Sequence, residues 1–383
     1  MFFYDFLNNP RINWRRIFGL FFKQVYTIIQ KKSADEDSTQ KGFLILDDSL
    51  MEKTGKTIEL IGKVFDYSTH AYRLGMKTLT LGYSDGKSFL PMDFSIHNEP
   101  GNTGKRGLKE KDLKNQFTKQ RDAKSPGYRR ESEVSQDKIS TSLQMINRCL
   151  NKWLKVDYVL VDTWFVCERF ITGVKDIDKK LNVIGMMKSN RMVVIHEKTY
   201  KANSVPEVKR KNIHYSSKLK CHYIRLEMTC KGIEMTGYWV RMKGQNTWNL
   251  LISTDKKLTF LKAMKNYQIR WSIEVFFRDC KQNLGLQNCQ SKDLDAHIAT
   301  ISIVFMNYLV LALKKRFEDY ETLGILFRCV KEMILQQTII QKIWIVILKL
   351  FGSVLGNFGI QWELFIRELI ANQSEKHLNL YSL

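Results

Sequence analysis

The sequence predicts an α/β fold in which a mixed β-sheet is flanked by helices. Short apolar runs typical of strands recur between residues 43 and 187, and segments with helical spacing alternate with the later ones. Two of these runs, 43–47 and 156–162, end in an aspartate. With 383 residues, 44% of them hydrophobic, the chain can bury the core of one elaborated domain or two.

The charge balance is strongly basic, with 61 Lys and Arg against 39 Asp and Glu, a formal net charge of +22 and a pI near 9.6. Such an excess indicates a polyanionic partner, with DNA or RNA first and an anionic membrane surface second. The seven cysteines form no Cys-x-x-Cys pair, which is typical of reduced thiols in a cytosolic protein. The Cys and His residues between 214 and 230 fit no usual spacing of a structural zinc site.

Residues 1–41 are expected to form a basic, helical N-terminal segment. Within it, residues 11–31 have the amphipathic spacing of a helix, which can pack on the core or lie along a phosphate backbone. Both interpretations stay open. Charges at Asp5 and Arg11 come too early for the apolar centre of a signal peptide.

Residues 42–189 are expected to form the first part of the core. The continuous apolar run 43–47 suits a strand covered on both faces. Residues 72–81 and 88–96 read as two further strands, joined at the turn 83–86.

A basic segment, 98–138, follows these strands. Between Gly101 and Glu133 it holds ten Lys or Arg against five acids. We expect a mobile basic loop that becomes ordered on DNA, with a solvated linker as the alternative.

The next elements read as a helix at 139–154, a strand at 156–162, a helix at 167–180 and a strand at 182–187. Together with the preceding strands, this is the order of an RNase H-like fold, an α/β layer with a mixed sheet.

The remaining chain divides into three expected parts. Alternating runs with few helix signals predict a β-rich insertion at 190–246, and 247–290 is expected to complete the core. Residues 291–383 read as a helical C-terminal region, in which 343–360 is expected to be a buried helical hairpin and not a membrane span.

Residues 267–281 read as one helix with an apolar face toward the core. At about 100° per residue, four polar side chains fall on one narrow stripe beside that face: Tyr267, Arg270, Glu274 and Lys281. Periodicity alone does not decide between a solvated charged face and a functional edge.

Three carboxylates are candidates for a divalent-metal site: Asp47, Asp162 and Glu274. If the strands that end in Asp47 and Asp162 pair in parallel, the two side chains emerge side by side at one edge of the sheet. Crowded carboxylates repel one another, and a hard cation offsets that cost, so the oxygen ligands suit Mg²⁺ or Mn²⁺. Two such ions can promote in-line phosphoryl transfer. Residues 54–57 lack the first glycine of a phosphate-binding loop, which argues against a nucleotide hydrolase.

The spacing Tyr-x2-Arg-x3-Glu-x6-Lys at 267–281 resembles the signature of the insertion-sequence-four family of DDE transposases. The run 46–49, Leu-Asp-Asp-Ser, looks like the family's first-acid motif, and 161–165, Val-Asp-Thr-Trp-Phe, is similar to its second. The resemblance covers about 43–284. It implies an RNase H-like catalytic domain in which the three acids are catalytic and bind two Mg²⁺ or Mn²⁺ ions. Asp48 is the alternative first acid.

The same resemblance implies contacts with transposon-end DNA from Tyr267, Arg270 and Lys281, and a base-stacking role for Trp248. It implies cut-and-paste transposition through a DNA hairpin, with double-stranded inverted-repeat ends and target DNA as substrates. A homodimer in the synaptic complex and a cytoplasmic, bacterial, nucleoid-associated location without a membrane are expected.

One departure from the family concerns the N-terminus, since the family often carries a longer DNA-binding region before its first acid and only 46 residues precede Asp47 here. An inactive or truncated DNA-binding remnant is therefore one alternative. An RNase H-like metal nuclease without strand transfer is the other.

Overall fold

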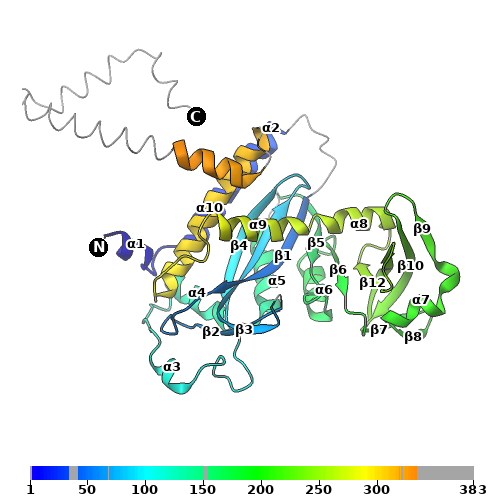
Figure 1. The fold of residues 1–383 in the computed structure, drawn as a ribbon, viewed down its shortest axis with the longest axis horizontal. Coiled ribbons are helices and arrows are strands. Elements are labelled where there is room, and N and C mark those ends of the chain that lie inside the picture. The colour runs from blue at the N-terminus through cyan, green and yellow to red at the C-terminus, as the bar shows by residue number, and fades with distance from the viewer. Residues whose placement is uncertain are drawn as a thin grey trace, which may run out of the picture. The chain divides into compact units, whose positions relative to one another are not determined.

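The computed structural model (Figure 1) describes residues 2–33, 42–67, 69–150, 154–318, 320 and 322–333. The chain divides into two compact units, Met1–Asp319 and Tyr320–Leu383. The first unit contains all labelled helices and strands. In the second, residues 323–333 are helical, and the expected hairpin at 343–360 lies outside the described residues.

The centre of the first unit is a mixed sheet with the strand order β4-β3-β1-β5-β6. The antiparallel members are β3 (Ala71–Ser84) and β4 (Phe89–His97), while β5 (Val156–Val161) and β6 (Asn182–Met187) run parallel to β1 (Gly42–Glu52). This arrangement, flanked by helices, confirms the mixed α/β fold and is consistent with an RNase H-like fold.

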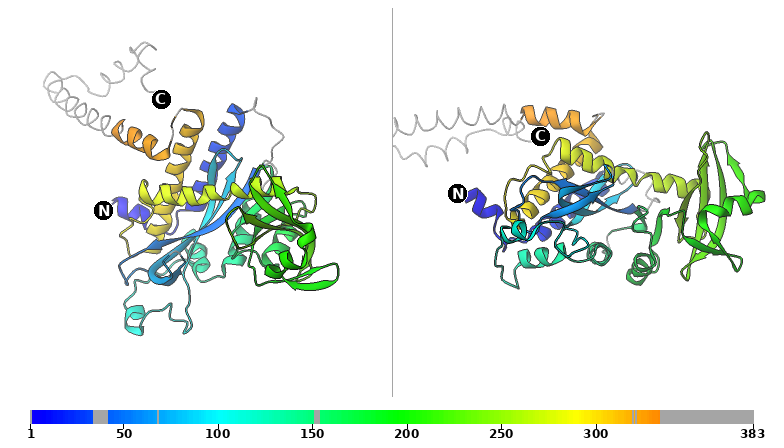
Figure 2. Two further views of the ribbon diagram at one scale, coloured as in Figure 1. Left: turned by 45° about the vertical axis from the view of Figure 1, so that its right-hand side comes forward. Right: turned by 60° about the horizontal axis from the view of Figure 1, so that its bottom comes forward.

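The burial of β1 explains why its sequence is continuously apolar. Phe43, Leu44, Ile45 and Leu46 are at most 2% exposed, because helices cover both faces of the sheet at this point. Figure 2 shows α9 (Trp271–Gln282) and α10 (Leu294–Phe317) on one face, and α5 (Lys138–Cys149) and α6 (Glu168–Ile177) on the other.

The predicted amphipathic helix near the N-terminus is α2 (Trp14–Lys32), which follows the short α1 (Phe2–Leu7). The Asn13 side chain caps α2 by accepting a hydrogen bond from the Arg16 N–H. Its apolar face packs on the core, with the Phe18 ring 6.3 Å from that of Phe94 and 5.9 Å from that of Phe305.

The segment 98–138 differs from the expected mobile loop. It contains α3 (Glu110–Lys114) and α4 (Pro126–Val134), and the side chain of Arg121 is fully buried among acidic partners. Some of its positive charges, those of Lys119, Arg121 and Arg130, therefore form internal ion pairs, which composition alone does not reveal.

The region 190–246 is rich in strands, as expected, and these strands continue the core sheet. They join it through β12 (Asn249–Ser253), which follows the region and pairs antiparallel with β6 (Figure 1), and the order runs on through β11, β10, β7 and β8. The remaining bounds are β2 (Gly62–Asp66), β7 (Met192–Ile195), β8 (Lys198–Lys201), α7 (Val205–Val208), β9 (His214–Ser216), β10 (Cys221–Cys230), β11 (Ile233–Met242) and α8 (Phe260–Gln268), with 3₁₀ turns at Ala202–Ser204 and Arg210–Asn212.

The prediction of one continuous helix over 267–281 is wrong at one point. Helix α8 ends at Gln268 and α9 begins at Trp271. Around Ile269 and Arg270, the backbone hydrogen bonds run from residue i to residue i−3, the tighter 3₁₀ pattern. Tyr267 and Arg270 thus flank a junction between two helices.

Among the described residues, α10 is the one helix long and apolar enough to cross a membrane. About two thirds (67%) of its apolar window is buried inside the protein. Its ring contacts, such as Phe305 to Phe276 at 4.9 Å, are those of a core helix.

Candidate active site

The parallel pairing of β1 and β5 brings two candidate acids to the same edge of the sheet. Leu46 pairs with Val161. The next residue on each strand is an aspartate, Asp47 on β1 and Asp162 just after β5. The parallel pairing on which the predicted juxtaposition depended is therefore observed.

Local hydrogen bonds orient both carboxyl groups. Asp162 Oδ1 accepts from the backbone N–H groups of Trp164 and Phe165 at 2.9 and 3.4 Å. Asp47 Oδ1 accepts from the Asp48 N–H at 2.8 Å. In each case the second carboxyl oxygen is left for other partners.

Arg270 connects the third candidate acid to the first. Its Nη1 donates to Asp47 Oδ2 at 2.9 Å, and its Nη2 donates to Glu274 Oε1, one helical turn further along α9. The side chains of Asp47, Arg270 and Glu274 are 17%, 15% and 33% exposed, so the cluster lies at the protein surface without being fully hydrated.

The pKa values of the two aspartates reflect their crowding. Burial and the negative charge of Asp162 raise the pKa of Asp47 to about 7, against the opposing effect of Arg270. Burial also raises the pKa of Asp162, with a further contribution from Asp48. Neighbouring carboxylates that resist joint ionisation are typical of sites that bind a cation.

Asp48, the alternative first acid, has a counter-ion of its own. Lys138 Nζ lies 2.7 Å from Asp48 Oδ2 and 5.3 Å from the centre of the Trp164 ring. Asp47, Asp48 and Asp162 all line one cavity of about 620 Å³. Asp47 thus shares Arg270 with Glu274, whereas Asp48 pairs with Lys138.

The donor set fits a hard divalent cation in its chemistry, since every candidate ligand is a carboxylate oxygen. In the described part of the chain, no group of three or more His, Cys, Asp or Glu side chains is arranged to hold a metal ion. The guanidinium of Arg270 instead lies between Asp47 and Glu274 as the cation that these acids share.

Two of the three candidate DNA-binding residues on the helical stripe lie together. The Tyr267 ring centre is 5.8 Å from the Arg270 guanidinium, and burial raises the pKa of the Tyr267 phenol to about 12. Lys281 lies near the far end of α9, where burial lowers its pKa and the charges of Asp66 and Glu52 oppose this. The structure therefore groups Tyr267 and Arg270 with the acids and places Lys281 nearer to Asp66 and Glu52.

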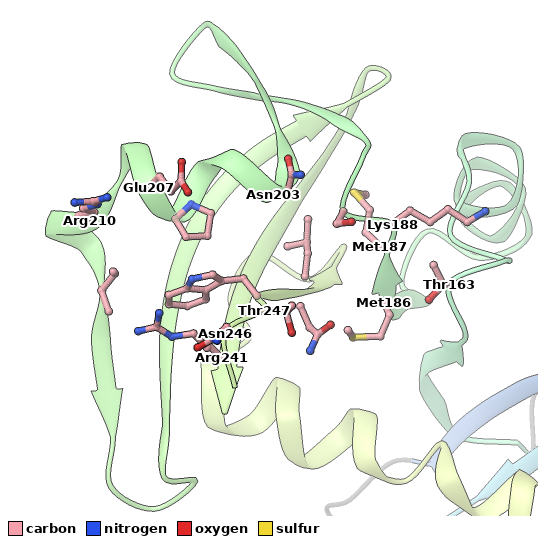
Figure 3. Close-up of a pocket in the computed structure, with 16 residues that line it drawn as sticks. Thr163, Met186, Met187, Lys188, Asn203, Glu207, Arg210, Arg241, Asn246 and Thr247 are labelled. Atoms are coloured by element: carbon pink, nitrogen blue, oxygen red, sulfur yellow. The ribbon is translucent and has the colours of Figure 1, made fainter. Parts of the chain in front are cut away.

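Trp248 lines a second cavity, of about 970 Å³, between the core and the inserted strands. The guanidinium of Arg241 lies 4.8 Å from the centre of its ring. Figure 3 shows Arg241 and Arg210 on one side of this cavity and Thr163, next to Asp162, on the other with Lys188.

The sequence analysis did not single out Arg241, Arg210 or Lys188. Lys188 directly follows β6, the strand beside β5, so it lies at the same edge of the sheet as Asp162. That placement was available from the predicted strand 182–187. The pairing of Arg241 with Trp248 was not, because it depends on the contact between β11 and β12.

Comparison with protein families identifies the chain. A search among curated proteins finds no match. The model of the family described as archaeal putative transposase ISC1217, a DDE transposase family, matches residues 122–340, which is more than half of the chain and includes Asp162, Trp248 and Glu274. The chain therefore belongs to the ISC1217 family of transposases.

Proposed function

We propose that this protein binds the inverted-repeat ends of its own mobile element and cuts and joins DNA at a site formed by Asp47, Asp162 and Glu274. The observations that support the proposal are the shared edge of β1 and β5, from which Asp47 and Asp162 follow, and the Arg270 bridge from Asp47 to Glu274. The Tyr-Arg-Glu-Lys spacing supports placing the chain near the insertion-sequence-four group.

Asp47, Asp162 and Glu274 are the residues that would hold Mg²⁺ or Mn²⁺, with two ions per site. When bound, such ions lower the pKa of an attacking water or 3′-hydroxyl and stabilise the leaving oxygen. The three carboxylates fix where that chemistry takes place, because two are held by strand pairing and one by the first turn of α9.

The remaining side chains position the DNA. Arg270 can grip a phosphate through two hydrogen bonds, Lys281 supplies a point charge, and Tyr267 can donate or stack. Trp248 offers a ring for an unpaired base, as a hairpin route requires. We further propose that two copies act on two ends in a synaptic complex, and that the protein works in the cytoplasm on the nucleoid.

The test uses Asp162→Ala and Glu274→Ala with duplex DNA from the borders of the gene. Strand cleavage in Mg²⁺ should disappear while DNA binding persists, because the acids serve the chemistry and the basic surface serves affinity. Asp47→Asn and Asp48→Asn, compared in the same assay, identify the first acid. Undiminished cutting by the Asp162 or Glu274 variant would contradict the assignment.

Two assays separate the proposal from its alternatives. Nicking of a labelled end in Mn²⁺ distinguishes an active enzyme from a DNA-binding remnant. Joining of a cut end to a second DNA distinguishes a transposase from a metal nuclease of the same fold.

A further inference from the structure

The guanidinium of Arg270 contacts the carboxyl oxygens that the proposed metal site requires. It donates to Asp47 Oδ2 at 2.9 Å and to Glu274 Oε1, and these contacts join the two acids. Arginine stays protonated and has only donors, so it cannot itself be a metal ligand. An ion that binds both Asp47 and Glu274 must therefore compete with Arg270 for their oxygens.

The position of Arg270 makes this contact exchangeable. The residue sits at the junction of α8 and α9, where the N–H groups of Ile269 and Arg270 bond to residue i−3, and its side chain is 15% exposed. Its other neighbour is the ring of Tyr267. A DNA phosphate offers the guanidinium two parallel hydrogen bonds, the geometry that arginine binds best.

We propose that Arg270 keeps the acid cluster closed to divalent metal until DNA is bound, so that DNA and metal bind cooperatively. A phosphate that takes over Arg270 frees Asp47 and Glu274 for the metal, and a metal on these acids frees Arg270 for the phosphate. The two effects must be equal in free energy, since coupling between binding sites is reciprocal. This inference rests on the proposed function, because it takes Asp47 and Glu274 as metal ligands.

The consequence is a safeguard. In the free protein, Arg270 weakens the metal site. DNA is therefore not cut until one of its strands lies where its phosphate can bind Arg270. The arrangement uses no extra domain, only one side chain with two alternative anionic partners.

The test measures binding of Mn²⁺ itself to the full chain without DNA, by the electron paramagnetic resonance signal of the free ion. Arg270→Gln should bind Mn²⁺ about tenfold more tightly than the unchanged protein, because it removes a charged competitor from two ligands. Thermal unfolding of the same samples checks that the variant is folded.

Two matched variants control for the loss of a positive charge. Arg278→Gln removes an arginine from α9, the helix that Arg270 precedes; its side chain is 59% exposed and lies 3.7 Å from Asp279. Lys138→Gln removes a cation that is 13% exposed, close to the 15% of Arg270, and pairs with Asp48. Both should change Mn²⁺ affinity less than Arg270→Gln, since neither blocks Asp47 or Glu274.

Adding a duplex from the borders of the gene completes the test. The unchanged protein should then bind Mn²⁺ more tightly, and Arg270→Gln should gain little. Equal Mn²⁺ affinity of the two proteins without DNA overturns the role of Arg270 and leaves the metal site standing. Failure of both proteins to bind Mn²⁺ even with DNA overturns the metal site, and the proposed function with it.

Discussion

Two arginines in this protein each hold several carboxylates, and they differ in how much water reaches them. The side chain of Arg121 is fully buried, and its partners Glu59, Asp293 and Asp295 are 3%, 8% and 4% exposed, while a fourth partner, Glu131, is 30% exposed. Arg270 and its partners are 15% to 33% exposed, and one of these partners, Asp47, lines a cavity.

Arg121 ties together three distant segments of the chain. It forms two parallel bonds of 2.7 Å with Glu59 and one of 3.1 Å with Asp295, which lies in the first turn of α10. Lys119 adds contacts to Asp293 and Asp295 at 2.7 and 3.1 Å. Nothing outside the protein can replace these partners, because solvent does not reach Arg121.

From this comparison we infer that burial, and not the kind of ion pair, separates a structural contact from an exchangeable one. A buried charge that loses its partner is left without compensation, whereas a partly exposed one can be hydrated or can take a new partner. Arg121 is therefore expected to serve stability and Arg270 to serve function.

The largest expected effect is on stability. Arg121→Gln should lower the free energy of unfolding by about 3–5 kcal/mol, since it strands buried carboxylates. Arg270→Gln should change it by about 1 kcal/mol or less, as is usual for partly exposed pairs. Urea unfolding followed by circular dichroism measures both. Similar losses for the two variants would show that exposure does not separate the two arginines.

A second effect concerns pH. The carboxyl of Asp47 has its pKa raised from 3.8 to about 7, so the folded state binds this proton more tightly than the unfolded state. The resulting stability is present at low pH and is lost as the pH rises toward 7 and above. Asp47→Asn stays neutral at every pH. The free energy of unfolding of this variant, relative to that of the unchanged protein, should therefore rise by about 3 kcal/mol between about pH 5 and pH 8.

This measurement is made in metal-free buffer, with urea unfolding of both proteins at each pH. All other titrating groups are common to the two proteins, so the difference reports Asp47. A difference that does not vary with pH would mean that Asp47 is ionised throughout the range. Adding Mg²⁺ together with a border duplex at pH 8 should stabilise the unchanged protein more than the variant, because a bound ligand favours the folded state.

Much of the fold could be predicted because it depends on local patterns. The apolar runs ending at Asp47 and Asp162 predicted buried strands, and their parallel pairing is confirmed by the register of Leu46 with Val161. Helix α10 (Leu294–Phe317) lies in the region 291–383, which the sequence predicts to be helical. In each case the signal lies in neighbouring residues, whose spacing reflects the face that they bury.

What the sequence did not show depends on contacts between distant segments. Arg121 sits in a lysine-rich stretch that reads as a loop, and its acidic partner Glu59 is 62 positions away. The bridge from Arg270 to Asp47 spans 223 positions and requires α9 to cross β1. The spacing of residues 267–281 placed Arg270 and Glu274 on one stripe. It could not show that Arg270 also reaches Asp47 on the sheet.

The smallest expected effect is on the salt dependence of DNA binding. It tests whether Arg270, unlike Arg121, contacts a DNA phosphate. Each protein–phosphate contact contributes about −0.9 to the slope of log affinity against log salt concentration. If Arg270 leaves its carboxylates for a phosphate, Arg270→Gln should bind a border duplex with a slope about 0.9 less steep. Arg121→Gln, under conditions where it stays folded, should keep the original slope, because Arg121 has no access to DNA.

Fluorescence anisotropy of a labelled duplex over a series of KCl concentrations measures these slopes. An unchanged slope for Arg270→Gln would mean that Arg270 stays on its carboxylates when DNA binds, and the contrast with Arg121 would then be one of burial alone.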